Sequence, residues 1–301
     1  MELWVYATIG ATIFQTLRFM LQKKLSMGAL STGGATFARF AYSAPLLAAV
    51  LAAWLVASDT ELPALSARFW TMGAIGGLAQ ILATVCVVAL FRERNFAVGI
   101  TFKKTEVVQA ALIGFIILGE GVSILGLVAI LVGLTGVLLL SSAPEAKGSL
   151  QERLFTRAAG LGLASGLLFA ISGVTYRAAT LEVGADAPLL RAAVTLSAVT
   201  LMQFCAMSLW LRVFEQGQIL AVWGARRKAL WIGLMSLGGS LGWFLAFTLQ
   251  TAAYVKALGQ IELIFSLMVS VLVFKERLSM REGIAIGFLS ASVLLLILVV
   301  R

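Results

Sequence analysis

Ten apolar runs, each about 20 residues long, decide what this chain can fold into. A helix of about 20 mostly apolar residues crosses the hydrocarbon core of a bilayer, whereas an open strand would leave its backbone groups unpaired in lipid. The runs lie near residues 3–21, 35–57, 69–91, 96–118, 122–140, 158–180, 188–211, 230–251, 255–274 and 282–300. Only 12% of the 301 residues are charged, against roughly 25% in a soluble protein. The sequence therefore predicts an all-α integral membrane protein with ten transmembrane helices.

The second half of the chain repeats features of the first at an offset of 156 residues. The matched positions are Glu106 and Glu262, Glu120 and Glu276, Ser123 and Ser279, and Gly10 and Gly166. The polar stretch Ser141–Arg157, which contains Pro144 and Gly148, separates five runs from the other five and is typical of a linker. These features predict a first five-helix repeat over residues 1–142, a linker over 143–157 and a second repeat over 158–301.

Glycines spaced four apart strengthen this interpretation. Gly73 and Gly77 lie in the third run, and Gly238 and Gly242 lie in the eighth. Small residues at this spacing let helix backbones approach closely in lipid. Because each half contains an odd number of spans, the halves should insert in opposite directions, as a 5+5 inverted-topology repeat of the kind found in many secondary transporters.

Basic residues gather on one side of the predicted membrane. The odd-numbered connections hold 14 lysines and arginines, while the other side, termini included, holds only Arg68, Lys256 and Arg301. Basic residues favour the cytoplasmic face, so we expect both termini outside, in a multi-pass protein of the cytoplasmic (inner) membrane. The net charge of +9 does not indicate nucleic acid, because the basic residues lie between apolar runs.

The paired hairpins, in which a long span ends in Gly119-Glu120-x-x-Ser123 or Lys275-Glu276-x-x-Ser279 before a leucine-rich span, resemble the EamA-type transporters of the drug/metabolite transporter superfamily. The resemblance covers nearly the whole chain. It implies export of amino acids, other metabolites or drugs, driven by an ion gradient or by exchange. Family members carry a proline after the glutamate that lies fourteen residues before the turn glutamate. Here those positions hold Val107 and Leu263, so the sequence gives no proline to kink the helix.

Relatives that carry nucleotide sugars are described with both termini in the cytoplasm. The count of basic residues places both termini of this chain outside, and the charge asymmetry is large enough that we expect the count to hold.

Charged residues within the fourth run are the strongest indication of function. Glu106 lies about 15 Å deep at 1.5 Å per residue, where a charge costs about 2.5–3.5 kcal/mol and usually faces a cavity or the bundle interior. Lys103 shares its helical face, so Glu106, with Lys103 or Lys104, could line a central cavity and bind substrate or a coupling proton. The alternative is a structural ion pair. Glu262, with Gln260 beside it, is the matched candidate in the second half.

Further polar or aromatic residues within spans are secondary candidates. Gln15 and Arg18 share a helical face, although Arg18 lies close enough to a span end to snorkel to the headgroups. Gln80 and Gln109 could contact substrate or instead bond a neighbouring helix. Trp243 is deep enough to wall an apolar pocket.

The residues in the turns have a simpler interpretation. Glu120 and Glu276 are expected to be solvated turn residues, and Ser123 is expected to cap the helix that follows it.

No enzyme signature, metal site or cofactor site is found in the sequence. The chain contains no histidine and two cysteines, which excludes a histidine-based site and a disulfide framework. The predicted function is a secondary transporter, an exporter of small organic metabolites with amino acids as the leading class, which works by alternating access. The alternatives are efflux of drugs or organic cations and a lipid flippase or scaffold. The expected partners are a small-molecule substrate, a proton or counter-substrate and the lipid bilayer, and the chain is expected to act as a monomer or homodimer.

Overall fold

The structure is a computed structural model that describes residues 2–26, 30–90, 102–141, 156–265 and 280–299. Within these ranges all regular structure is helical. In chain order the elements are α1 (Leu3–Ser26), α2 (Thr32–Ala57), α3 (Ala67–Leu90), α5 (Glu106–Leu118), α6 (Ile124–Ser141), α8 (Arg157–Leu181), α9 (Pro188–Phe214), α10 (Gln218–Gly224), α11 (Arg226–Leu249), α12 (Ala252–Leu258), the 3₁₀ turn η1 (Gly259–Ile261) and α14 (Met280–Val299).

Five helices are both long and apolar enough to cross a membrane: α2, α3, α8, α9 and α11. The structure therefore shows five of the ten predicted spans as long apolar helices in the described ranges. α5, α6 and α14 contain shorter apolar stretches, and α1 is made less apolar by Gln15 and Arg18. The predicted fourth and ninth spans extend into residues 91–101 and 266–279, which lie outside the described ranges. The short helix α10 was not predicted.

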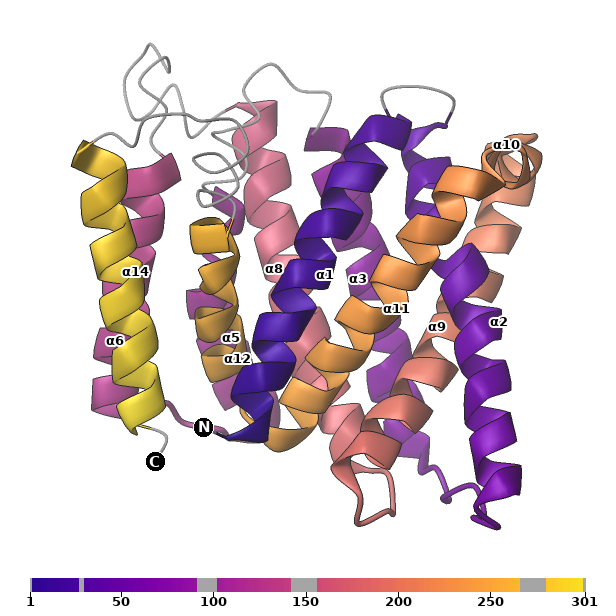
Figure 1. The fold of residues 1–301 in the computed structure, drawn as a ribbon, viewed down its shortest axis with the longest axis horizontal. Helices are drawn as coiled ribbons and strands as arrows, with labels where there is room; N and C mark the ends of the chain where they lie inside the picture. Colours follow the sequence, from indigo (N-terminus) through magenta and orange to yellow (C-terminus); the bar gives the residue numbers. More distant parts are fainter. Residues whose placement is uncertain (1, 27–29, 91–101, 142–155, 266–279, 300–301) are drawn as a thin grey trace.

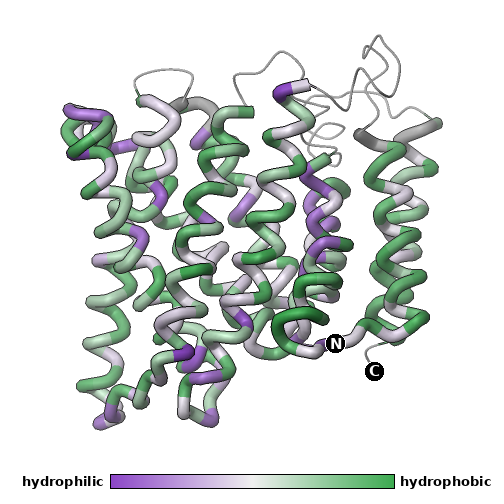
Figure 2. The backbone as a smooth tube through the Cα atoms, turned by 180° about the vertical axis from the view of Figure 1, so that it is seen from behind, coloured by the Kyte–Doolittle hydropathy of each residue, from purple (hydrophilic) through white to green (hydrophobic). Residues whose placement is uncertain are grey.

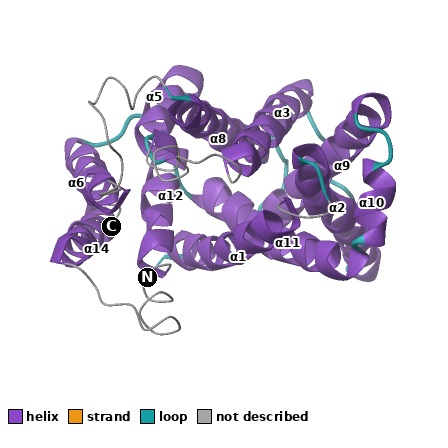
Figure 3. Ribbon diagram, turned by 90° about the horizontal axis from the view of Figure 1, so that it is seen from above, coloured by secondary structure: helices purple, strands orange, loops and turns teal. Residues whose placement is uncertain are grey.

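The helices form a layered bundle whose contacts follow the 156-residue offset. That offset carries α1 onto α8 and α3 onto α11, and the most extensive helix contacts are α1 with α11 and α3 with α8. The contacts α2 with α9 and α6 with α14 each join a helix to its own offset mate. Seen from above, α6 and α14 lie at one end of the molecule beside α5 and α12, and α2, α9 and α10 lie at the other (Figure 3). Both termini lie on the same side (Figure 1).

Glycines allow the close helix contacts, though not in the same way in the two halves. In α11, a Cβ added at Gly242 would lie 2.8 Å from the carbonyl oxygen of Ala7 in α1. In α3, Gly73 and Gly77 face α9, and it is Gly76 that lies against α8, where an added Cβ would lie 2.5 Å from the Thr175 hydroxyl. By analogy with Gly242, which packs against α1, the glycine pair Gly73 and Gly77 would be expected to pack against α8, the offset mate of α1. It packs against α9 instead.

The α-helical geometry is interrupted immediately before Glu106 and Glu262. Phe102 and Lys103 are helical, Lys104 and Thr105 form a turn, and α5 begins at Glu106. In the second half, the 3₁₀ turn η1 ends one residue before Glu262. Breaks therefore exist at both positions although the prolines are absent. Figure 2 shows hydrophobic residues along most of the helices, with hydrophilic ones at helix ends and at a few places within the bundle.

Packing explains these breaks. A Cβ at Gly166 of α8 would lie 2.9 Å from the carbonyl oxygen of Lys103, so that carbonyl lies directly on α8. Thr105 donates its hydroxyl hydrogen bond to the Phe102 carbonyl at 2.7 Å. Gly259 lies against the Trp243 ring, since a Cβ added at Gly259 would lie 2.6 Å from the nearest ring atom. A short 3₁₀ stretch within a helix often marks a functional hinge.

Candidate functional site

Glu262 joins residues from both halves of the chain. The ammonium of Lys104 donates to its Oε1, and Gln15 Nε2 donates to its Oε2 at 3.1 Å. Trp243 Nε1 in turn donates to Gln15 Oε1 at 3.1 Å. The chain of contacts links α11, α1, the residue after η1 and the turn before α5. The sequence analysis grouped Lys104 with Glu106 as a lining residue of the same cavity, but the ion pair of Lys104 is with the acid of the other half.

Glu106 has a local partner, as the sequence predicted. Lys103 Nζ lies 3.5 Å from its Oε2, and the two side chains are 5% and 9% exposed. Lys103 also lies over the Phe169 ring of α8, at 5.1 Å from the ring centre. The first acid is therefore buried with one lysine of its own segment, and the second is paired across the molecule.

A small polar cavity lies beside these pairs, between α1, α2, α3, α8, α11 and α12. It is lined by Gln15, Arg39, Gln80, Phe169, Ser172, Gly173, Tyr176, Ser240, Trp243, Phe244, Phe247 and Lys256. Its volume is about 20 Å³, which is room for one or two water molecules. In this conformation the cavity is closed to anything larger than water.

Lys256 is held in the cavity by aromatic ring faces. Its ammonium lies 5.1 Å from the centre of the Trp243 ring, 5.3 Å from that of Phe169 and 5.8 Å from that of Phe247. Ring faces attract a cation at these distances. Among the described residues, no carboxylate forms an ion pair with it. The count of loop charges had placed Lys256 at the membrane surface; it lies instead in the protein interior.

Arg39 reaches the same cavity from α2 and is bonded only to hydroxyl groups within the described ranges. Its guanidinium donates to Ser236 at 3.0 Å, to Ser240 at 3.1 Å and to Thr84 at 3.3 Å. The residue is 4% exposed. Three of its five N–H donors are thereby used, and no acidic partner neutralises the charge.

Arg18 does not snorkel. It is 3% exposed, and its Nη1 donates to Gln22 Oε1 at 2.6 Å while Gln22 Nε2 donates to the Ala35 carbonyl at 3.0 Å. The guanidinium also lies over the Phe19 ring, at 4.2 Å. The snorkelling interpretation was wrong because Gln22, one turn later on the same face, supplies a buried acceptor.

The predicted glutamines play different parts. Gln80 Oε1 lines the cavity and accepts from the Tyr176 hydroxyl at 3.1 Å and from Gln203 Nε2 at 3.0 Å, so it ties α3 to α8 and α9. Gln109 Nε2 donates to the Thr105 hydroxyl at 3.2 Å within its own segment. Gln109 is not among the residues that line the cavity.

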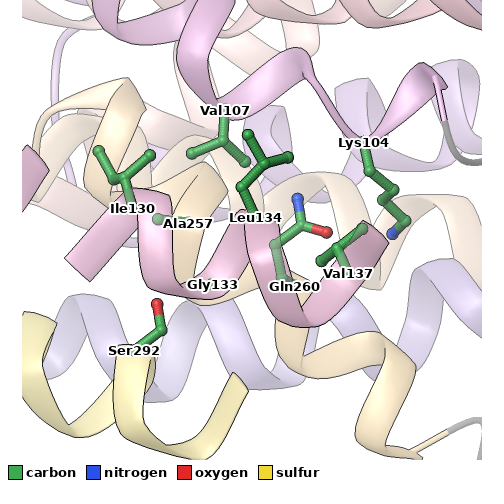
Figure 4. Close-up of a pocket in the computed structure, with 9 residues that line it drawn as sticks. All are labelled: Lys104, Val107, Ile130, Gly133, Leu134, Val137, Ala257, Gln260 and Ser292. Atoms are coloured by element: carbon green, nitrogen blue, oxygen red, sulfur yellow. The ribbon is translucent and has the colours of Figure 1, made fainter. Parts of the chain in front are cut away.

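Gln260 lies in a second, smaller space, of about 10 Å³, between α5, α6, η1 and α14. Figure 4 shows it with Lys104 at one end of this space and the apolar side chains Val107, Ile130 and Leu134 around it. Gln260 Oε1 is buried without a hydrogen-bond partner in the described residues.

The turn residue Glu120 is not free in solvent as expected, but is partly buried, with its side chain 19% exposed, and is paired with Arg177. Its carboxylate accepts from Arg177 Nε at 2.6 Å, and Arg177 Nη1 also donates to the carbonyls of Phe247 and Gln250. Ser123 caps α6 as predicted, since its Oγ accepts from the Gly126 amide at 3.1 Å. Ser279 and Glu276 lie outside the described residues.

The buried charges form one cluster. Glu106 interacts electrostatically with Lys103, Lys104, Lys256 and Glu262, and Arg18 interacts with Arg39 and Glu262. The sequence identified both acids, both lysines of the first half and Arg18. It did not identify Arg39 or Lys256 as members of a site. The signal that could have found Lys256 is its place two residues inside the ninth predicted run.

No group of three histidine, cysteine, aspartate or glutamate side chains in the described ranges is arranged to hold a metal ion.

Comparisons with known proteins establish the fold alone. No protein-family model matches the chain, and no curated protein matches it in sequence. A solved structure described only as "Crystal structure of protein" is similar over 96% of this chain and 98% of that chain, with a TM-score of 0.66 and 18% sequence identity. The chain therefore shares its fold, over nearly its whole length, with a solved structure.

Proposed function

We propose that this chain is a ten-helix secondary transporter, built as a 5+5 inverted-topology repeat and similar to the EamA-type transporters of the drug/metabolite transporter superfamily. The exchange of helix contacts under the 156-residue offset supports the repeat, because α1 with α11 and α8 with α3 are the same contact made twice. Both termini on one side of the molecule (Figure 1) agree with an even number of spans.

The observation that carries the proposal is the meeting of buried charges at two helix breaks beside a cavity that can hold water. Ionisable groups within membrane helices are costly and mark substrate or ion pathways, and carriers place their sites at the midplane beside discontinuous helices. Glu106 and Glu262 each follow such a break. A purely structural ion pair would need neither the cavity nor the breaks.

The mechanism that fits this geometry is alternating access. The cavity, at about 20 Å³, is too small for a metabolite, which can enter only if the surrounding helices part on one side and then on the other. The α1–α11 and α3–α8 pairs are the natural rigid units, since each has the closest internal packing. The Lys104–Glu262 contact joins the turn of the first break to the residue that follows the second, and its loss or exchange would accompany opening.

The substrate proposed is a small organic metabolite, with amino acids as the first class to test and export as the direction. The driving force would be a proton gradient or a counter-substrate. Efflux of organic cations is the less favoured alternative, because Glu106 and Glu262 already have lysine partners.

Lipid handling is a second candidate, on one observation. An apolar cavity of about 310 Å³ lies between α2, α9 and α11, and its lining includes the exposed Trp54, Val50 and Leu189. A lipid-handling protein would move labelled lipid across vesicles irrespective of an imposed pH gradient.

Transport in proteoliposomes tests the proposal. Vesicles loaded with labelled amino acids should release label through the purified chain, and Glu106→Gln should slow release about tenfold or more, since it removes a buried charge worth several kcal/mol. The matched control is Glu61→Gln, an exposed residue between α2 and α3, which should release label at the normal rate. Unchanged release by Glu106→Gln would overturn the assignment of this residue.

A further inference from the structure

The buried cluster carries more positive than negative charge. Its cationic members are Arg18, Arg39, Lys103, Lys104 and Lys256, and its only acids in the described ranges are Glu106 and Glu262. Five cations and two carboxylates leave three positive charges in excess. Uncompensated charge in a membrane interior is expensive, so this excess indicates that something negative spends part of the cycle there.

Both acids are already engaged, and the two cations that face the cavity form no ion pair with a carboxylate in the described ranges. Glu106 contacts Lys103, and Glu262 contacts Lys104. The two basic residues in the cavity lining are Arg39 and Lys256. Arg39 uses three of its five donors, all on hydroxyl groups, and the Lys256 ammonium lies over three aromatic rings.

Five aromatic side chains make up half of the remaining lining, alongside Gln15, Gln80, Ser172, Gly173 and Ser240. Phe169, Tyr176, Trp243, Phe244 and Phe247 all contribute to it, and Tyr176 and Phe244 lie with their ring centres 4.4 Å apart. Such a wall suits a flat apolar group. A carboxylate suits the guanidinium and the ammonium, since charge-assisted hydrogen bonds of this kind are the strong ones.

We propose that this cavity, when it opens, binds a small aromatic carboxylate of net negative charge, with its acid group on Arg39 and Lys256 and its ring among Phe169, Trp243 and Phe247. The inference rests on the proposed function and narrows its substrate class. A zwitterion would bring an ammonium group for which the site has no unpaired acid in the described ranges, and an organic cation would add to the excess of positive charge.

Three ligands that share a phenyl ring and a two-carbon linker to the charged group test the charge requirement. They are 3-phenylpropionate, an anion; phenylalanine, a zwitterion; and phenethylamine, a cation. Binding to the purified full chain in detergent is measured by calorimetry and by the ligand-dependent rise in melting temperature. We expect 3-phenylpropionate to bind about tenfold or more tightly than phenylalanine, and phenethylamine not to bind. Phenylalanine binding as tightly as the anion, or no binding of the anion, overturns the inference.

Variants at Lys256 locate the acid group. Lys256→Met should weaken binding of 3-phenylpropionate by about 10–100-fold, the range for loss of a hydrogen bond to a charged group, while Lys256→Arg keeps the charge and should retain most of the affinity. The control Lys228→Met, at an exposed position, should bind normally. Equal affinity of Lys256→Met and the unchanged chain for 3-phenylpropionate would refute this placement. If the variant fails to fold, the comparison of the three ligands on the unchanged chain still tests the charge requirement.

Flux separates this inference from the transporter proposal. If 3-phenylpropionate binds but no labelled compound, this anion included, crosses proteoliposomes, the cavity is an anion site in a protein that is not a carrier. If phenylalanine is both bound and transported in preference to the anion, the carrier proposal stands and the anion inference is wrong.

Discussion

Glu106 and Glu262 occupy matched positions, yet the partners of the two acids differ in kind. Lys103, the partner of Glu106, is three residues away in the same segment. Lys104, the partner of Glu262, comes from the other half of the chain. A local pair can form and break without moving a helix, whereas the cross-molecule pair can separate only if the two broken helices move apart. The second pair is therefore the better candidate for a contact that changes during transport.

Glu262→Gln should both destabilise the protein and abolish transport. Breaking a buried ion pair by removing one partner costs about 3–5 kcal/mol, because the remaining charge is left buried. The unpaired residue here is Lys104, whose side chain is 2% exposed. We expect a lowered melting temperature in detergent and flux at the level of empty vesicles.

The double variant Lys104→Met/Glu262→Gln separates a structural from a functional role. Replacing both partners of a buried pair is often nearly neutral for stability, so its melting temperature should recover most of the way. Transport should remain absent if the pair acts in the cycle. Recovery of flux along with stability would show that the pair only holds helices together.

At the scale of the helix, the breaks before the two glutamates coincide with contacts between helices and not with any feature of the local sequence. The expected proline is absent, and local propensity gives no reason for a break at Thr105. The breaks coincide with Lys103 lying against Gly166 and with Gly259 lying against Trp243, contacts between residues far apart in the chain. The spacing of the glutamates could be found in the sequence. The breaks beside them could not, because they coincide with contacts to α8 and α11, which are distant in the chain.

Gly259→Ala should impair the site through Trp243. A Cβ at this position would lie 2.6 Å from the Trp243 ring, while the backbone φ of −58° is compatible with alanine. The indole must move, which weakens its hydrogen bond to Gln15 and so the support of Glu262. Overpacking of this kind costs about 1–3 kcal/mol. We expect a lower melting temperature and a reduced rate of transport.

Two controls accompany this variant. Gly160→Ala is the same substitution in α8, where an added Cβ meets nothing within 4 Å, and it should behave like the unchanged chain. Gly259→Ala/Trp243→Phe removes the indole and should regain stability, because the smaller ring can accept the methyl group. If the double variant is no more stable than Gly259→Ala, the clash with Trp243 is not the cause.

The long helices themselves were largely predictable. α2, α3, α8, α9 and α11 each begin and end within a few residues of a predicted apolar run, because hydropathy over about 20 residues depends only on the chain itself. α10 was missed since seven residues are too few to show such a pattern.

The acids and two of the lysines of the site were predictable, but the ion pairs that they form were not. The packing of the two halves determines which lysine pairs with which glutamate. It also brings Arg39 and Lys256 to the same cavity.

At the scale of the whole molecule, the fold fixes which segments share a side, and the basic residues decide which side faces the cytoplasm. The termini and the turn between α2 and α3 lie on one side, and α10 with the start of α11 lies on the other (Figure 1). Arg226, Arg227 and Lys228 are all exposed at the start of α11. A bilayer that keeps basic residues on its cytoplasmic face would orient the protein with both termini outside.

Cysteine labelling in intact cells checks this orientation. In a background in which Cys86 and Cys205 are replaced by serine, Glu61→Cys should react with a membrane-impermeant maleimide added outside, because its segment lies on the side of the termini. Lys228→Cys should react only after the membrane is permeabilised. Both positions are exposed, so a difference in labelling reports side and not burial. The reverse pattern would place the termini in the cytoplasm and leave the fold intact; labelling of both sites from outside would mean that the two segments share a side, which this arrangement of helices forbids.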